Sequence, residues 1–96
     1  MIDPKTREFI RRTIRSYLPD PSYRLFLFGS RTQTHHHPYS DVDIGIEGRS
    51  RVSAKVLADI EEALEESDLP VRVGVVDFIS VASDFRRIAQ MHAQSL

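Results

Sequence analysis

The first apolar residues of the chain recur at the spacing of an α-helix. Asp3-Pro4 is a typical helix start, because Asp is a favourable N-cap and Pro is well tolerated in the first helical turn. Pro19-Asp20-Pro21 interrupts the pattern and predicts a turn. The sequence therefore predicts an amphipathic helix between these two points. Its apolar positions are Phe9, Ile10, Ile14, Tyr17 and Leu18.

Three later segments have the composition and periodicity of β-strands. Tyr23–Phe28 is aromatic-rich and apolar on nearly both faces, which predicts a central strand. The second strand, Val42–Ile46, alternates apolar and polar residues, so that Asp43 shares one face with the preceding Asp41. Val71–Asp77 predicts a third strand, in which the odd-numbered valines and the final aspartate share a face.

Two further helical patterns alternate with these strands. Ser53 is a candidate N-cap for a second helix that ends at Leu69-Pro70, and a last helix begins within Ser80–Asp84. The order of helix, strand, strand, helix, strand and helix predicts an α/β (α+β) fold, a small mixed β-sheet flanked by helices. We expect one domain over residues 1–96. The expected inner positions of the two helices are Val56, Leu57, Ile60, Ala63, Leu64, Phe85, Ile88, Ala89 and His92.

Composition narrows the possible classes of function. The formal net charge of -1 gives no general electrostatic case for nucleic-acid binding. Cysteine is absent, which excludes disulfides and thiolate metal sites. No apolar run approaches the roughly 20 residues that span a bilayer, and the N-terminus has no apolar signal-peptide region. These features fit a cytoplasmic protein, and a chain of 96 residues has no room for a separate large substrate domain.

The stretch with the clearest chemical potential joins the first two strands. Gly29-Ser30 follows the first strand, and Asp41-Val42-Asp43 comes after ten intervening residues. Gly29 lets a phosphate approach the backbone closely, and Ser30 is a candidate cap for a helical turn through Arg31–Thr34, whose free N–H groups would face an anion. Arg31 would add a charged fork to the phosphates. The stretch therefore predicts a phosphate-binding turn beside a pair of carboxylates.

The paired aspartates suit a metal-bound nucleoside triphosphate. Magnesium normally takes one or two carboxylates together with phosphate oxygens, and Asp41 and Asp43 would offer two on one strand face. Asp77 ends another strand, and we expect it to bring a third carboxylate beside them. Such a cluster is stable only with cations. With two metal ions, Asp77 would serve as base or shared ligand on the side of the attacking hydroxyl.

The combination of Gly29-Ser30, Asp41-x-Asp43 and a later strand ending in Asp77 resembles the polymerase-β-like nucleotidyltransferase superfamily. The short length is similar to the minimal nucleotidyltransferases of prokaryotes, and the resemblance runs from about Tyr23 through Asp77. The run His35-His36-His37 departs from the family pattern, in which small or basic residues are expected in this loop.

The resemblance implies transfer of AMP from ATP to an acceptor hydroxyl, with release of pyrophosphate and with Mg²⁺, two ions, as cofactor. It also implies a HEPN-domain toxin as partner, with this chain as the antitoxin that adenylylates a tyrosine of the toxin. Carried over to this sequence, the metal-binding and catalytic residues are Asp41, Asp43 and Asp77. The nucleotide-binding residues are Gly29, Ser30, Arg31 and Ser40.

Several of these residues also have an ordinary structural explanation. Asp41 and Asp43 would suit a solvent-facing strand, and Asp77 would suit a cap on the turn that follows it. Gly29-Ser30 would suit a strand end and a cap, and Arg31 would balance the acidic charge. The combination in one short chain favours the catalytic interpretation over these separate ones.

The sequence leaves other interpretations open. Three roles are open for His35-His36-His37: adventitious binding of nickel or zinc, a metal site, or a polar loop at the mouth of the nucleotide site. Three adjacent imidazoles rarely reach one tetrahedral ion, which disfavours the metal site.

Two alternatives to AMP transfer onto a toxin also remain open. The chain would neutralise its partner by contact alone, or it would modify a small molecule such as an aminoglycoside. Both homo-oligomers and hetero-oligomers are compatible with the sequence. We expect five arginines to lie on solvated helix faces rather than to contact RNA, namely Arg11, Arg12, Arg15, Arg86 and Arg87.

Overall fold

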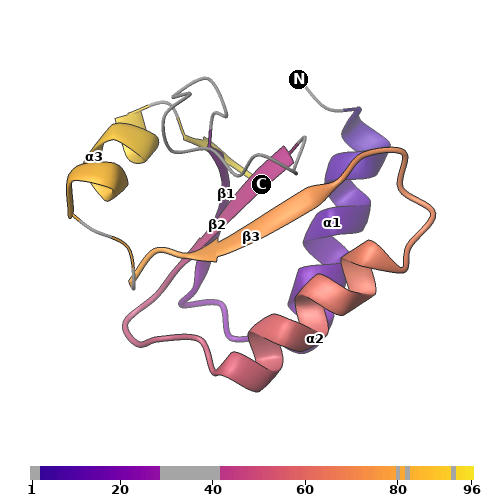
Figure 1. Ribbon diagram of the computed structural model, residues 1–96, viewed down its shortest axis with the longest axis horizontal. Coiled ribbons are helices and arrows are strands. Elements are labelled where there is room, and N and C mark those ends of the chain that lie inside the picture. The colour runs from indigo at the N-terminus through magenta and orange to yellow at the C-terminus, as the bar shows by residue number, and fades with distance from the viewer. Residues whose placement is uncertain (1–2, 29–41, 80, 82, 92) are drawn as a thin grey trace.

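A four-stranded mixed sheet forms the centre of the computed structural model, which describes residues 3–28, 42–79, 81, 83–91 and 93–96. The strand order is β3-β2-β1-β4 (Figure 1). β1 pairs in antiparallel fashion with both β2 and β4, whereas β2 and β3 run parallel. The strands are β1 (Arg24–Phe28), β2 (Val42–Glu47), β3 (Val73–Asp77) and β4 (Gln94–Ser95). The predicted small mixed sheet is confirmed.

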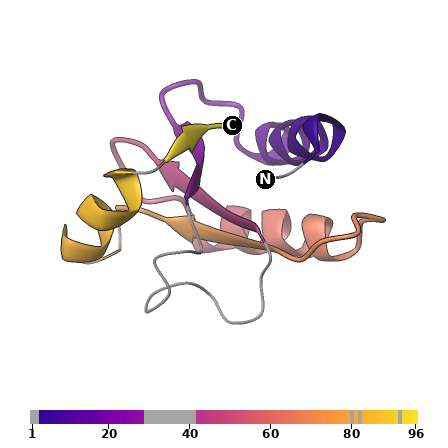
Figure 2. The ribbon, with the colours of Figure 1, turned by 90° about the horizontal axis from the view of Figure 1, so that it is seen from above.

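In the described part of the chain, the helices that accompany the sheet are α1 (Pro4–Tyr17), α2 (Ala54–Glu65) and α3 (Ser83–Met91). Seen from above, α1 and α2 lie together on one side of the molecule, and α3 lies at its other end (Figure 2). All three helices were expected from the sequence. For the inner positions expected in the last helix, the structure describes the backbone but not the side chains of Phe85, Ile88 and Ala89, and His92 lies outside the described residues.

The first two helices begin at the residues that the sequence predicts, and a side-chain cap bond forms at α2. Pro4 begins α1 directly after Asp3, which has extended backbone angles but makes no side-chain cap bond. Ser53 precedes α2, and its hydroxyl oxygen accepts a hydrogen bond from the Val56 N–H at 3.1 Å. The predicted N-cap of the second helix is therefore confirmed, because this bond satisfies one of the N–H groups that a helix start leaves free.

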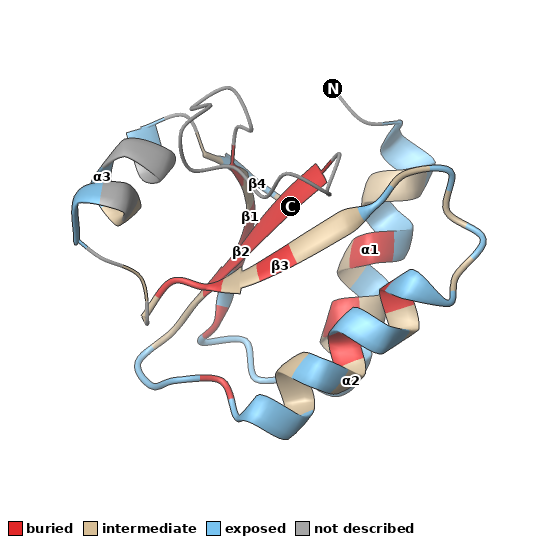
Figure 3. Ribbon diagram, viewed as in Figure 1, coloured by how far each residue is buried: buried red, intermediate tan, exposed pale blue. Residues whose placement is uncertain are grey.

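The core lies between the sheet and the pair α1 and α2, and Figure 3 shows the buried residues on the inner sides of these helices. Ile10 and Ile14 are fully buried, as the sequence predicts. Phe9 and Tyr17, expected in the same stripe, are 42% and 43% exposed. They flank the line of Ile10, Ile14 and Leu18, spaced four residues apart, and these three residues belong to the core shared with the sheet.

The sheet has two chemically different faces. Val42, Ile44 and Ile46 of β2 belong to the core beneath α1 and α2, and their side of the sheet is the helix-covered face. The alternate residues of β2, Asp43 and Gly45, therefore point to the other side. That side is called the aromatic face here, because the clustered rings of Phe26, Phe28 and Phe78 lie on it.

The sheet differs from the sequence prediction in β3 and β4, and β1 and β2 each differ by one residue at one end. β3 begins at Val73 rather than at Val71, although Val71 still packs against the core. β4 was not predicted, since two residues are too few to show a period. It continues into a hydrogen bond from the Leu96 N–H to the Leu25 carbonyl at 3.0 Å. Within the described ranges, no helix combines the length and apolar character needed to cross a membrane.

Candidate functional site

Asp43 is the best-defined residue of the predicted site. It lies on the aromatic face of β2, where only 2% of it is exposed. Its register partner on β1 is Phe28, the last residue of that strand. The chain therefore leaves β1 and enters β2 at one end of the sheet, directly beside Asp43. A buried carboxylate at such a junction is costly unless hydrogen bonds or a cation stabilise its charge.

Part of the predicted site lies outside the described residues, and its assignment stays a prediction. This part includes Asp41, the predicted helical turn over residues 31–34 and the histidine run over residues 35–37. The nucleotide-binding residues expected there are Gly29, Ser30, Arg31 and Ser40. The register fixes one relation only: the strands on both sides of this segment meet at the pair Phe28 and Asp43.

Asp77 does not lie beside Asp43. It pairs with Ile46 on β2, and Asp43 pairs with Gly74 on β3. Residues paired across parallel strands point to the same face, so Asp77 lies on the helix-covered face with Ile46. Asp77 is also offset from Asp43 by three residues along the strands, which is about 10 Å at the usual rise per residue. The expectation that Asp77 joins the paired aspartates is therefore corrected.

The carboxylate of Asp77 has a structural role in its own position. Its Oδ2 accepts a hydrogen bond from the Val52 N–H at 2.8 Å, and its Oδ1 accepts one from the Ile79 N–H at 3.1 Å. The first bond ties the loop before α2 to the end of β3. The second closes the turn after β3, which is the capping role that the sequence left open. With 7% of it exposed, Asp77 is a buried acceptor for two backbone donors.

The aromatic face is closely packed around Gly45. The Phe26 and Phe78 rings meet edge to face with centroids 4.9 Å apart, and those of Phe28 and Phe78 lie 5.0 Å apart. A Cβ on Gly45 would lie 2.5 Å from the Phe26 ring and 2.8 Å from the Phe78 ring. Glycine is thus required for close approach of the rings, which support the end of β1 next to Asp43.

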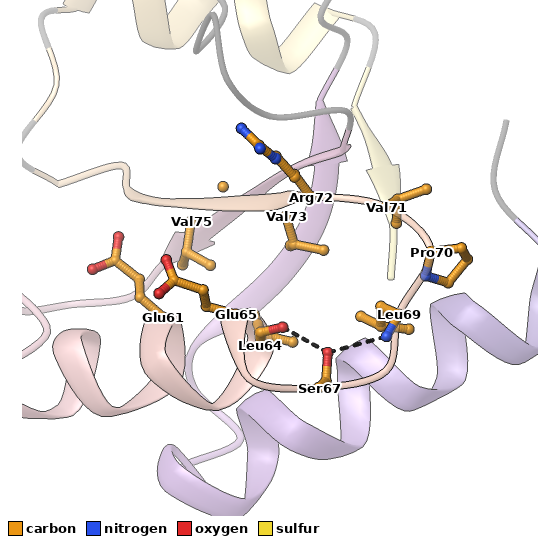
Figure 4. A pocket seen from close by; sticks show the side chains of 11 residues that line it. Glu61, Leu64, Glu65, Ser67, Leu69, Pro70, Val71, Arg72, Val73 and Val75 are labelled. Carbon is orange, nitrogen blue, oxygen red and sulfur yellow. Dashed lines mark hydrogen bonds between the residues drawn. The ribbon is translucent and has the colours of Figure 1, made fainter.

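A hollow of about 710 Å³ lies elsewhere, between α2 and β3. In Figure 4, the side chains of Val73 and Val75 point toward Leu64, and Ser67 donates a hydrogen bond to the Leu64 carbonyl at 2.6 Å. Asp43 is not among its lining residues. The hollow is an edge of the core between α2 and the strand, and we do not assign the phosphates to it.

With this geometry in place, comparison with known proteins identifies the family. A family model described as "Nucleotidyltransferase domain" matches residues 7–96. The chain belongs to the nucleotidyltransferase family. This confirms the family resemblance that the spacing of Gly29-Ser30 and Asp41-x-Asp43 suggested, and a nucleotide is accordingly the substrate class.

Named relatives of this nucleotidyltransferase agree with that assignment. It is 36% identical over 88 residues to "Probable protein adenylyltransferase MntA" of Haemophilus influenzae. These aligned residues cover 91% of this chain and 76% of the relative. A crystal structure of a mutant MntA–HpeT toxin–antitoxin complex matches with a TM-score of 0.68 and 22% identity, over 100% of this chain and 72% of that one. A tri-AMPylated Shewanella oneidensis HEPN toxin in complex with its MNT antitoxin matches with a TM-score of 0.56 and 18% identity, over 93% and 70%. The two structures confirm the expected nucleotidyltransferase fold.

Within residues 3–28 and 42–79, the carboxylates on the aromatic face fit one magnesium ion better than two. Asp43 would provide a hard oxygen ligand on a rigid strand, and Mg²⁺ commonly uses one or two carboxylates plus phosphate oxygens. Among the described residues, no three His, Asp or Glu side chains gather at a common metal position. Glu47 shares the aromatic face with Asp43 but forms an ion pair with Arg24, with N and O 2.9 Å apart. The described part of the chain therefore supplies one carboxylate to this position.

Proposed function

We propose that this nucleotidyltransferase transfers AMP from ATP to a hydroxyl group of a HEPN-domain toxin and thereby acts as its antitoxin. The observation that carries the proposal is the 36% identity to a probable protein adenylyltransferase over 91% of the chain. The related complex with an AMPylated HEPN toxin supports this class of acceptor. We place the reaction in the cytoplasm, where ATP is available, and we assign residues 1–96 to one nucleotidyltransferase domain.

The reaction is a displacement at the α-phosphorus of ATP. The oxygen of the acceptor hydroxyl forms a bond to this phosphorus, and the bond from the phosphorus to the oxygen that bridges to the β-phosphate breaks. Pyrophosphate leaves with the bonding electron pair, and the hydroxyl proton passes to a base or to water. AMP is then linked to the acceptor through a phosphodiester, and the atoms and charges of ATP and acceptor are all accounted for.

Asp43 contributes to this reaction by position and charge. Together with Asp41 it would hold Mg²⁺, which when bound neutralises phosphate charge and orients the triphosphate. Asp43 lies on a strand with neighbours on both sides, so its carboxylate is positioned before ATP arrives. Such preorganisation reduces the reorganisation needed in the transition state. Tyrosine is the acceptor that the family resemblance implies.

The test uses ATP labelled at either the α- or the γ-phosphorus, together with the purified HEPN partner and Mg²⁺. We expect label from the α-position alone to appear on the partner, and mass spectrometry to map it to tyrosine. Asp43→Asn should abolish the transfer. Asp68→Asn is the matched control, because it makes the same chemical change at an exposed aspartate and should leave the transfer intact.

The same pair of variants separates catalysis from neutralisation by contact. If AMP transfer is the mechanism, Asp43→Asn still forms the complex with the toxin but no longer protects growing cells from it. Protection by Asp43→Asn equal to that by the unmodified chain would contradict the proposal and favour the contact mechanism. Label from the γ-phosphorus on the partner would also contradict it, since phosphoryl transfer would then be the reaction.

A further inference from the structure

Gly74 is the β3 residue that lies beside Asp43. The two are register partners in the parallel pair of β2 and β3, so they share the aromatic face. Neighbouring strands lie about 4.8 Å apart, and two catalytic metal ions typically lie about 3.5–4 Å apart. A carboxylate at position 74 would therefore reach an ion held by Asp43 or a second ion next to it. Gly74 is half-buried and has no side chain to offer.

The described side chains of Asp77 and Glu47 do not supply a carboxylate at this position. Asp77 lies on the helix-covered face and accepts hydrogen bonds from the Val52 and Ile79 N–H groups. Glu47 is four residues farther along β2 from Asp43, about 13 Å at the usual rise per residue. Its Oε1 is bound to Arg24. The next β3 residue on the aromatic face after Gly74 is Val76, which packs against the phenylalanine cluster.

We infer that β3 supplies no metal ligand in this protein, because Gly74 occupies the only β3 position beside Asp43, and that the chain with its nucleotide holds a single divalent cation. This inference rests on the proposed function. In a two-metal displacement, one ion activates the attacking hydroxyl and the other stabilises the leaving group. Ligands for an ion on the hydroxyl side would have to come from the acceptor protein, so catalysis would depend on formation of the complex with that partner.

The test counts bound Mn²⁺ by electron paramagnetic resonance, with Mn²⁺ as probe for Mg²⁺. The nucleotide is α,β-methylene-ATP, whose methylene bridge prevents AMP transfer. We expect the unmodified chain to bind one tight Mn²⁺ ion and Gly74→Asp to bind a second one. Gly74→Asn adds a side chain of nearly the same size without the negative charge, so it should stay at one ion.

The outcomes distinguish the inference from the function on which it rests. Two tight ions on the unmodified chain, or no second ion on a folded Gly74→Asp variant, would overturn the inference and leave the proposed function standing. No Mn²⁺ on any variant in the presence of the analogue would overturn both.

A further variant keeps the test decisive if Gly74→Asp does not fold. Asp77→Asn in the otherwise unmodified chain should still bind one tight Mn²⁺ ion with the analogue, because Asp77 lies on the helix-covered face. Loss of that ion from folded Asp77→Asn would make Asp77 a metal ligand and overturn the inference. Circular dichroism of each variant establishes that it is folded.

Discussion

At the scale of single residues, the aromatic face depends on which positions have no side chain. Gly45 allows the Phe26 and Phe78 rings to approach the sheet, whereas Gly74 leaves the position beside Asp43 without a ligand. Both glycines lie within strands, where glycine usually weakens the structure because it has no side chain to pack. At Gly45 the close approach of two rings compensates for that cost. At Gly74 the absence of a side chain means that β3 offers no metal ligand beside Asp43.

Gly45→Ala should destabilise the protein. The new methyl group would lie 2.5 Å from the Phe26 ring and 2.8 Å from the Phe78 ring, so the packed rings must shift. Overpacking of this kind typically costs about 1–3 kcal/mol. Urea unfolding followed by circular dichroism measures the change in the free energy of unfolding.

The double variant Gly45→Ala with Phe26→Leu provides the control for this prediction. The smaller leucine side chain makes room for the new methyl group, so Gly45→Ala should cost less in this background than in the unmodified chain. An equal cost in both backgrounds would show that the methyl group does not act through the Phe26 ring.

At the scale of elements, the register of two parallel strands determines the site more than the spacing of residues along the chain. The sequence predicted the three longer strands, three helices and the Ser53 cap because each has a local pattern. Asp41 and Asp43 were assigned to one face by simple alternation, and of these two the structure places Asp43, on the side of β2 opposite to Val42, Ile44 and Ile46. Whether Asp77 meets them depends on the offset between β2 and β3, which no local pattern encodes. An offset that pairs Asp43 with Gly74 puts Asp77 on the opposite face.

The structural role of Asp77 at the junction of elements gives a second prediction. Asp77→Ala removes the acceptor for the Val52 and Ile79 N–H groups and should lower the free energy of unfolding. Loss of hydrogen bonds to a charged acceptor typically costs about 1.5–3 kcal/mol. Asp77→Asn keeps one carbonyl oxygen and should lose less. Chemical denaturation of both variants measures the difference.

Transfer of AMP by the two Asp77 variants separates a structural from a catalytic role. If the role of Asp77 is structural, folded Asp77→Asn should retain AMP transfer at a temperature well below its melting point. If Asp77→Asn instead loses transfer and is as stable as the unmodified chain, Asp77 acts in catalysis, and the assignment of its carboxylate to the two backbone donors is insufficient.

At the scale of the whole molecule, one face of the small sheet packs the core that stabilises the fold, and the other face carries the proposed site. The helix-covered face packs α1 and α2 onto β1, β2 and β3 and contains most of the buried aliphatic side chains. The aromatic face carries Asp43 at one end, and the phenylalanine cluster begins beside it at Phe28. Because the core on the first face does not involve Asp43, a change of its charge should alter ligand binding without disrupting the packing of α1 and α2.

Thermal unfolding in the presence of nucleotides tests this division on the intact protein. A ligand at about 100 times its dissociation constant stabilises a protein by about 2.7 kcal/mol, which for a domain of this size corresponds to a rise in Tm of roughly 10 °C or more. We expect such a rise with ATP only when Mg²⁺ is present, and a smaller one with GTP, CTP or UTP. Asp43→Asn should abolish the Mg²⁺-dependent rise, because the ion loses a carboxylate ligand, while Asp68→Asn retains it. A rise of equal size with Asp43→Asn would mean that the nucleotide binds away from the aromatic face, and the site would have to be reassigned.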